Sequence, residues 1–191
     1  MDAKIGRGAN LDHTLTATLV LGRDMNDVGT DIGPKIAQIL EAAVAYQRGS
    51  GVVLVVAPGH NPNFPDQPKS YAQMMADHLK ALGVGRVEIL QADHFSTFGE
   101  LSALYRYCEE RGIDEYEVFG QRWHLRRAGC EAWSVSPEWA AKLRLVSIPG
   151  GMSAFDLMIE PFKWLKLILP RQWQIRAITF WRRYISRRTS Y

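Results

Sequence analysis

His124 and Arg127 are the two residues in this sequence whose types and spacing best suit chemistry. They stand three residues apart in QRWHLRRAG (121–129), directly after the apolar run EVFG (117–120). Residues three apart lie on one face of a helix. An imidazole can donate and accept a proton, and a guanidinium can form two bonds with a carboxylate or phosphate. The pair therefore suits an anionic ligand. The alternative is that Arg127 pairs with a surface acid while His124 caps its helix.

Alternating strand and helix patterns determine where these two residues lie. Short apolar runs predict five strands, at residues 15–22, 51–59, 86–92, 115–120 and 142–150. Helical spacing and capping residues predict four intervening helices, at 34–49, 70–83, 96–112 and 124–133, with Ser70 and either Ser96 or Thr97 as N-caps. This alternation predicts a Rossmann-like three-layer α/β/α fold with a five-stranded, mainly parallel sheet. Two further helices are expected at 153–169 and 171–188.

The strand-to-helix loops of such a sheet share one edge, and ligands bind in the crevice at that edge. Helix starts there also favour anions, because they expose backbone N–H groups. His124 and Arg127 are the candidate catalytic residues, with Asp24 or Glu100 as the group that orients His124. The candidate ligand-binding residues at this edge are Gly22, Arg23, Asp24, Gly59, His60, Asn61, Ser96, Thr97 and Glu100.

The order of these motifs over residues 15–150 resembles the YdcF/SanA/ElyC family of domains of unknown function. WHLRRA (123–128) matches the aromatic-His-x-x-Arg-Ala signature of that family, Gly22 its first-strand glycine, and Thr97 the threonine of its Asn-Thr-x-Glu-Asn motif. By this resemblance the chain is expected to be a divergent member, since Tyr71 and Gly120 stand where the family pattern has a glutamate and a threonine. The family's Ser-Gly-Gly becomes Ala57-Pro58-Gly59, and Ser96, Gly99 and Glu100 replace Asn, Glu and Asn.

The resemblance implies a Rossmann-like fold with a polar pocket at this edge. It also suggests S-adenosylmethionine or nucleotide-like ligands and, for some members, a role in the cell envelope. The residues themselves name no reaction. Neither G-x-G-x-x-G nor a P-loop is present, so we do not expect NAD or ATP to bind through those motifs. The histidines that close strands do not form a metal-ligand motif, so we do not expect a metal. Neither cysteine follows a strand, and Cys130 is expected to pack in the core.

The charge is distributed unevenly along the chain. The net charge is +3, yet all 20 acidic residues lie at or before Glu160, and residues 161–191 carry eight cations. We expect one domain over 1–191, made of the core at 15–150 and a basic helical extension at 151–191. The alternative function is a non-catalytic adaptor whose segment 171–191 contacts a membrane surface or a protein; nucleic acid is less favoured. Without a signal peptide or a long apolar stretch, we expect a cytoplasmic protein, at most peripheral to the inner face of the membrane.

Overall fold

Five parallel strands form the sheet in the computed structural model of the chain. The structure describes residues 16–21, 31–46, 51–56, 68–93, 96–149, 154–170, 172, 173 and 176. The strands are β1 (Thr16–Val20), β2 (Val52–Val56), β3 (Val87–Leu90), β4 (Glu115–Gln121) and β5 (Arg144–Ile148). They lie in the order β3-β2-β1-β4-β5, and every pairing is parallel. The winding therefore reverses between β1 and β4, which is where ligands bind in folds of this class.

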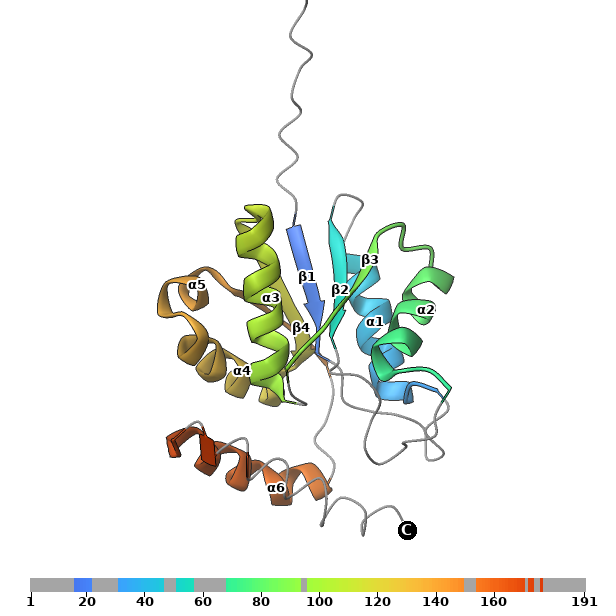
Figure 1. Ribbon diagram of the computed structural model, residues 1–191. Helices are drawn as coiled ribbons and strands as arrows, with labels where there is room; N and C mark the ends of the chain where they lie inside the picture. The colour runs from blue at the N-terminus through green and yellow to red at the C-terminus, as the bar shows by residue number, and fades with distance from the viewer. Residues whose placement is uncertain are drawn as a thin grey trace, which may run out of the picture.

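Helices cover both faces of the sheet, which confirms the predicted three-layer Rossmann-like fold (Figure 1). On one face, α1 (Pro34–Tyr46) and α2 (Tyr71–Ala81) pack against Val20, Val53, Val55 and Phe119. On the other lie α3 (Thr97–Arg111), α4 (Arg122–Val135) and α5 (Pro137–Lys142). The predicted cap Ser70 accepts a hydrogen bond from the backbone N–H of Gln73 at 3.2 Å, which starts α2.

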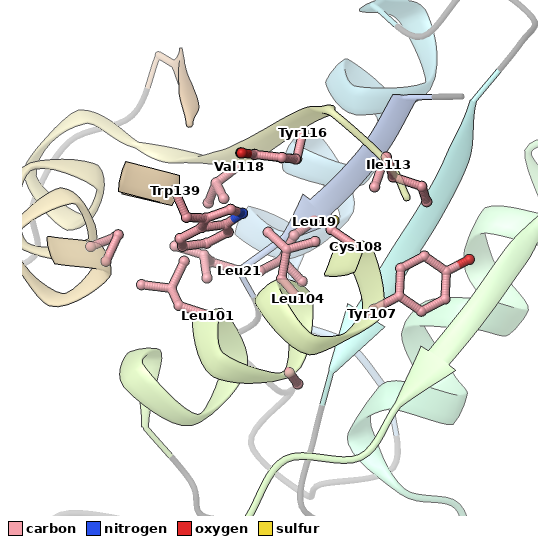
Figure 2. Close-up of a cluster of buried hydrophobic side chains, with 14 of the residues drawn as sticks. Leu19, Leu21, Leu101, Leu104, Tyr107, Cys108, Ile113, Tyr116, Val118 and Trp139 are labelled. Atoms are coloured by element: carbon pink, nitrogen blue, oxygen red, sulfur yellow. The ribbon is translucent and has the colours of Figure 1, made fainter. Parts of the chain in front are cut away.

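Alternate residues of β1 supply the two separate cores. Ala17, Leu19 and Leu21 point into the core beneath α3, α4 and α5, whereas Val20 points toward α1 and α2. Figure 2 shows the first of these cores, in which Leu19 lies among side chains of α3, β4 and α5. Both faces of β1 are covered, since residues 17–20 are all buried, including the polar Thr18.

Helix α5 was absent from the sequence-based prediction, which placed no element between α4 and β5. Its N-cap is Ser136, whose hydroxyl accepts from the backbone N–H of Trp139 at 3.3 Å, and Pro137 is its first residue. Trp139 is buried, stacks on Tyr116 with ring centroids 5.3 Å apart, and meets Tyr105 edge-on at 5.6 Å. A serine followed by a proline was thus the available signal for this helix.

The last described helix lies at the carboxyl ends of the strands. α6 (Ala154–Leu165) continues as the 3₁₀ helix η1 (Lys166–Ile168), as the sequence predicted for 153–169. In Figure 1, α6 crosses the end of the molecule toward which β1 points. The helix expected at 171–188 falls almost entirely outside the described residues. Within the described part of the chain, no helix has the length and apolar character needed to cross a membrane.

The two cysteines differ in exposure, and the expectation for Cys130 is wrong. Cys130 is exposed on α4, whereas Cys108 on α3 is buried. The buried face of α4 includes Ala128 and Ala132, and Cys130, two residues from each, points away from it. Burial raises the pKa of the Cys108 thiol to about 12.

We therefore expect a thiol reagent to label Cys130 rapidly in the native protein, and Cys108 only after unfolding. A thiol with a pKa near 12 is almost wholly protonated near neutral pH, and the thiolate is the reactive form. Counting modified thiols by intact-protein mass spectrometry, before and after denaturant is added, tests this. Native Cys130→Ser should remain unlabelled; labelling of that variant as fast as the wild type would contradict the burial of Cys108.

Candidate functional site

The candidate site begins where β4 passes directly into α4. α4 starts at Arg122, two residues earlier than predicted, so His124 and Arg127 both lie in its first two turns. A Cβ atom at Gly120 would come within 3.3 Å of a Leu125 side-chain carbon. Glycine at this position therefore lets the first turn of α4 pack closely on the end of its strand. His124 and Arg127 are both buried, at 6% and 4% exposure.

The start of α3 brings Thr97 to the same place. Ser96, rather than Thr97, is the N-cap, since its Oγ accepts from the backbone N–H of Gly99 at 3.0 Å. The Thr97 hydroxyl is therefore left for contacts with other elements, and it lies 3.0 Å from His124 Nε2. Thr97 and His124 are 27 residues apart in sequence, so this contact joins two strand-to-helix connections.

A hydrogen-bonded chain runs through the Thr97 hydroxyl. Arg127 Nη1 donates to Thr97 Oγ1 at 3.2 Å, and the same oxygen contacts His124 Nε2. Arginine can only donate, so Thr97 Oγ1 accepts from Arg127, and the hydroxyl keeps one hydrogen and one lone pair with which it can pair with Nε2 in either tautomer. The Thr97 hydroxyl therefore connects the guanidinium to the imidazole. Thr97 therefore contacts His124 Nε2; of the two groups that the sequence suggests for orienting His124, Asp24 lies outside the described residues and Glu100 lies in the same first turn of α3 as Thr97.

Two buried carboxylates hold the Arg127 guanidinium. Nη1 donates to Glu131 Oε1 at 2.9 Å, and Nε donates to Glu160 Oε1 at 3.1 Å. The Glu131 and Glu160 side chains are 2% and 9% exposed. The alternative of a surface ion pair for Arg127 is therefore wrong, since its partners are buried acids. The alternative that His124 caps its own helix is also wrong, because α4 has no side-chain cap hydrogen bond.

α6 contributes a second ionic contact to this cluster. Lys163 Nζ lies 3.2 Å from Glu160 Oε2 and 5.4 Å from the centre of the Trp123 ring. That ring in turn stacks on His124, with centroids 5.5 Å apart and planes inclined by 22°. The two cations Arg127 and Lys163 therefore match the two acids Glu131 and Glu160 in number. Such pairing is what allows ionic groups to be buried together.

The other predicted site residues are distributed unevenly with respect to this cluster. Ser96 and Glu100 flank Thr97 in the first turn of α3, so the structure brings these three to the same helix start. Six residues lie outside the described part of the chain, and their relation to the cluster is not described: Gly22, Arg23, Asp24, Gly59, His60 and Asn61. Among the residues that the structure describes, no three His, Cys, Asp or Glu side chains gather as metal ligands.

The sequence did not lead to Glu131, Glu160 or Lys163, and it indicated Trp123 only as the aromatic position of the WHLRRA motif. Glu131 follows Arg127 by four residues, a spacing at which oppositely charged side chains commonly pair on a helix. That signal was present and could have been used. Glu160 lies 33 residues beyond Arg127, and no spacing rule links positions so far apart. Its one local sign is the partner Lys163 three residues later.

The fold and the buried cluster define a Rossmann-like α/β protein with polar side chains at the carboxyl ends of its strands. No model of a known protein family matches this chain, and no curated protein matches it. The resemblance to the YdcF/SanA/ElyC family therefore remains a prediction from the motifs of the sequence.

Proposed function

We propose that the protein binds a small anionic or nucleotide-like ligand at the carboxyl ends of its strands. The observation that carries this proposal is the buried, hydrogen-bonded cluster of Thr97, His124 and Arg127 beside the reversal point of the sheet. Buried polar networks at this position are typical of ligand sites in folds of this class. The proposed membership of the YdcF-like family adds S-adenosylmethionine to the ligands worth testing.

The residues of the cluster have distinct roles in this proposal. Arg127 supplies the charge that recognises a phosphate or carboxylate. Thr97 can exchange hydrogen bonds with both the ligand and the imidazole. His124 is the group that would donate or accept a proton if a reaction occurs, because imidazole titrates near neutral pH. Trp123 provides an aromatic ring next to His124, suited to a nucleobase or other flat group.

The charge balance determines how an anion could enter. With Arg127 already paired to Glu131 and Glu160, an added phosphate would leave the buried cluster with excess negative charge. Glu131 is fixed on the same helix as Arg127, whereas Glu160 comes from α6. An anionic ligand therefore has to replace the Glu160 carboxylate on Arg127 Nε, and α6 has to shift to allow it.

Thermal denaturation with inorganic phosphate, ATP and S-adenosylmethionine, each added separately, tests the proposal. A ligand at about 100 times its dissociation constant stabilises the protein by about 2.7 kcal/mol. For a chain of this size, that stabilisation raises the melting temperature by about 5–10 °C. We expect His124→Gln and Thr97→Val to reduce the shift, since each keeps the side-chain volume but changes the hydrogen bonds.

Two further variants make the result decisive. Glu160→Gln should tighten the binding of an anionic ligand by about tenfold or more, because it removes the competing charge. Arg111→Lys, at the far end of α3 from Thr97, is the matched control and should bind as the wild type does. If no ligand shifts the melting temperature, or if Thr97→Val and Arg111→Lys behave alike, the proposed site is wrong.

A second candidate function is association with a membrane surface through the basic extension. The observation that favours it is the exposure of large apolar side chains in this part of the chain: Leu157, Met158, Phe162, Leu165, Ile168 and Trp173 are each more than half exposed. Contiguous apolar side chains on a protein surface commonly mark a contact with a membrane or a protein. Under this proposal, the arginines of segment 171–191 attract the protein to anionic lipid, with no requirement for catalysis.

A further inference from the structure

We propose that the outward face of α6 is the surface that lies on an anionic lipid bilayer, with the helix axis parallel to the membrane. This inference rests on the second candidate function and names the surface that makes the contact. It places the contact on α6 itself, in addition to the basic segment that follows.

Apolar residues form a continuous stripe along this face. Met158, Phe162 and Leu165 follow one another in α6 at intervals of four and three residues, the spacing of one helix face. They are 66%, 65% and 55% exposed. Exposing such a stripe to water is unfavourable, and burying it in an apolar environment is stabilising. We name these three residues the α6 stripe.

The opposite face of α6 fixes the helix to the rest of the protein. Glu160 is buried against Arg127, and Lys163 lies between Glu160 and the Trp123 ring. Residues 160 and 163 point to the far side of the helix from the α6 stripe, because successive residues are rotated by about 100°. The stripe therefore points away from the body of the protein, in an orientation that these ionic contacts maintain.

Charge identifies a bilayer as the occupant rather than a second copy of the chain. Eight lysines and arginines and no acid occupy residues 161–191, which include most of the α6 stripe. Two copies that associated through this part of the chain would bring two segments of like charge together, whereas an anionic surface attracts such a segment. Trp173 and Arg176 extend the same pattern, with Trp173 55% exposed and the Arg176 guanidinium 5.7 Å from its ring centre. Tryptophan and arginine are favoured at the level of the lipid headgroups.

The length of α6 fits a helix that lies on the surface. Its 12 residues rise about 18 Å, less than the roughly 30 Å hydrocarbon core of a bilayer. In Figure 1, α6 runs across the end of the molecule at which the strands terminate, and a bilayer on its outer side would face that end. The candidate ligand site would then lie on the membrane-facing side of the protein.

Vesicle co-sedimentation of the full-length protein tests the inference. We expect binding to vesicles that contain phosphatidylglycerol, weak binding to pure phosphatidylcholine, and weakening with added salt. The double variant Phe162→Glu/Leu165→Glu should lower the partition coefficient by tenfold or more. Trp133→Glu is the matched control, since Trp133 is 58% exposed on α4, and it should bind as the wild type does.

A third variant separates this inference from the proposal on which it rests. Replacing Arg182, Arg183, Arg187 and Arg188 by glutamine removes charge beyond α6 and leaves the α6 stripe intact. If this variant loses binding while Phe162→Glu/Leu165→Glu retains it, the basic segment alone makes the contact and the inference is overturned. If wild-type protein binds no anionic vesicle, both fail. If sedimentation shows a dimer that Phe162→Glu/Leu165→Glu dissociates, the stripe is occupied by a second copy, and the inference is also overturned.

Discussion

Replacing Arg127 with methionine should lower the free energy of unfolding by about 3–5 kcal/mol, the usual cost of removing one partner from a buried ionic network. Methionine nearly fills the volume of the arginine stem, but it leaves Glu131 and Glu160 buried without their shared cation. Urea denaturation monitored by circular dichroism measures the loss. The same variant should lose affinity for any anionic ligand, so its stability has to be measured before its binding is interpreted.

Matched neutralisation of the two acids provides the control. In Arg127→Met/Glu131→Gln/Glu160→Gln, the carboxylates that the first change stranded are gone, and we expect much of the lost stability to return, less the cost of removing Glu160 from Lys163. The three single effects should therefore sum to far more than the triple variant loses. Additive effects, or a loss below about 1 kcal/mol in Arg127→Met, would show that the guanidinium does not hold a buried network.

Replacing Trp139 with alanine should cost about 3–5 kcal/mol, because it empties the largest side-chain volume on α5. Trp139 is 4% exposed and contacts the rings of Tyr116 and Tyr105. Its loss would separate α5 from the core shared by α3 and β4. Thermal and urea denaturation both measure the effect, and the loss of near-ultraviolet circular dichroism should accompany it.

Two other tryptophan variants give this prediction its controls. Trp133→Ala, on the exposed side of α4, should change the stability by no more than about 0.5 kcal/mol. Trp139→Phe should fall between the two, since it keeps an aromatic ring in the stack. Equal effects of Trp133→Ala and Trp139→Ala would mean that α5 does not depend on the buried ring.

The sheet was predictable from the sequence because its signals are local and repeated. The strands are short and rich in apolar residues, and α1, α2 and α3 each begin at a proline or a capping serine. The alternation of strands and helices along the chain then predicts parallel pairing. α5 was missed because six residues are too few to show helical periodicity. The prediction for Cys130 was wrong because it rested on the position of Cys130 in the same helix as His124. The buried face of that helix includes Ala128 and Ala132, and Cys130 lies on another face.

The candidate site was only partly predictable, for a different physical reason. Thr97, His124 and Arg127 could be placed near one another because each follows a strand end, and parallel strands end at one edge. Glu160 could not be placed, since its position depends on how α6 packs, and α6 is not part of the alternating pattern. Which acids pair with Arg127 therefore depends on the packing of α6 and not on residue type alone.

The order in which the chain is made gives the Arg127–Glu160 contact a further consequence. Thirty-three residues separate the two, so a ribosome adding about 5–20 residues per second delivers Glu160 roughly 2–7 s after Arg127. All five strands precede Glu160 in the chain, so the whole sheet is synthesised before this carboxylate. The contact between Arg127 and Glu160 therefore depends on a segment that is made after every strand of the sheet.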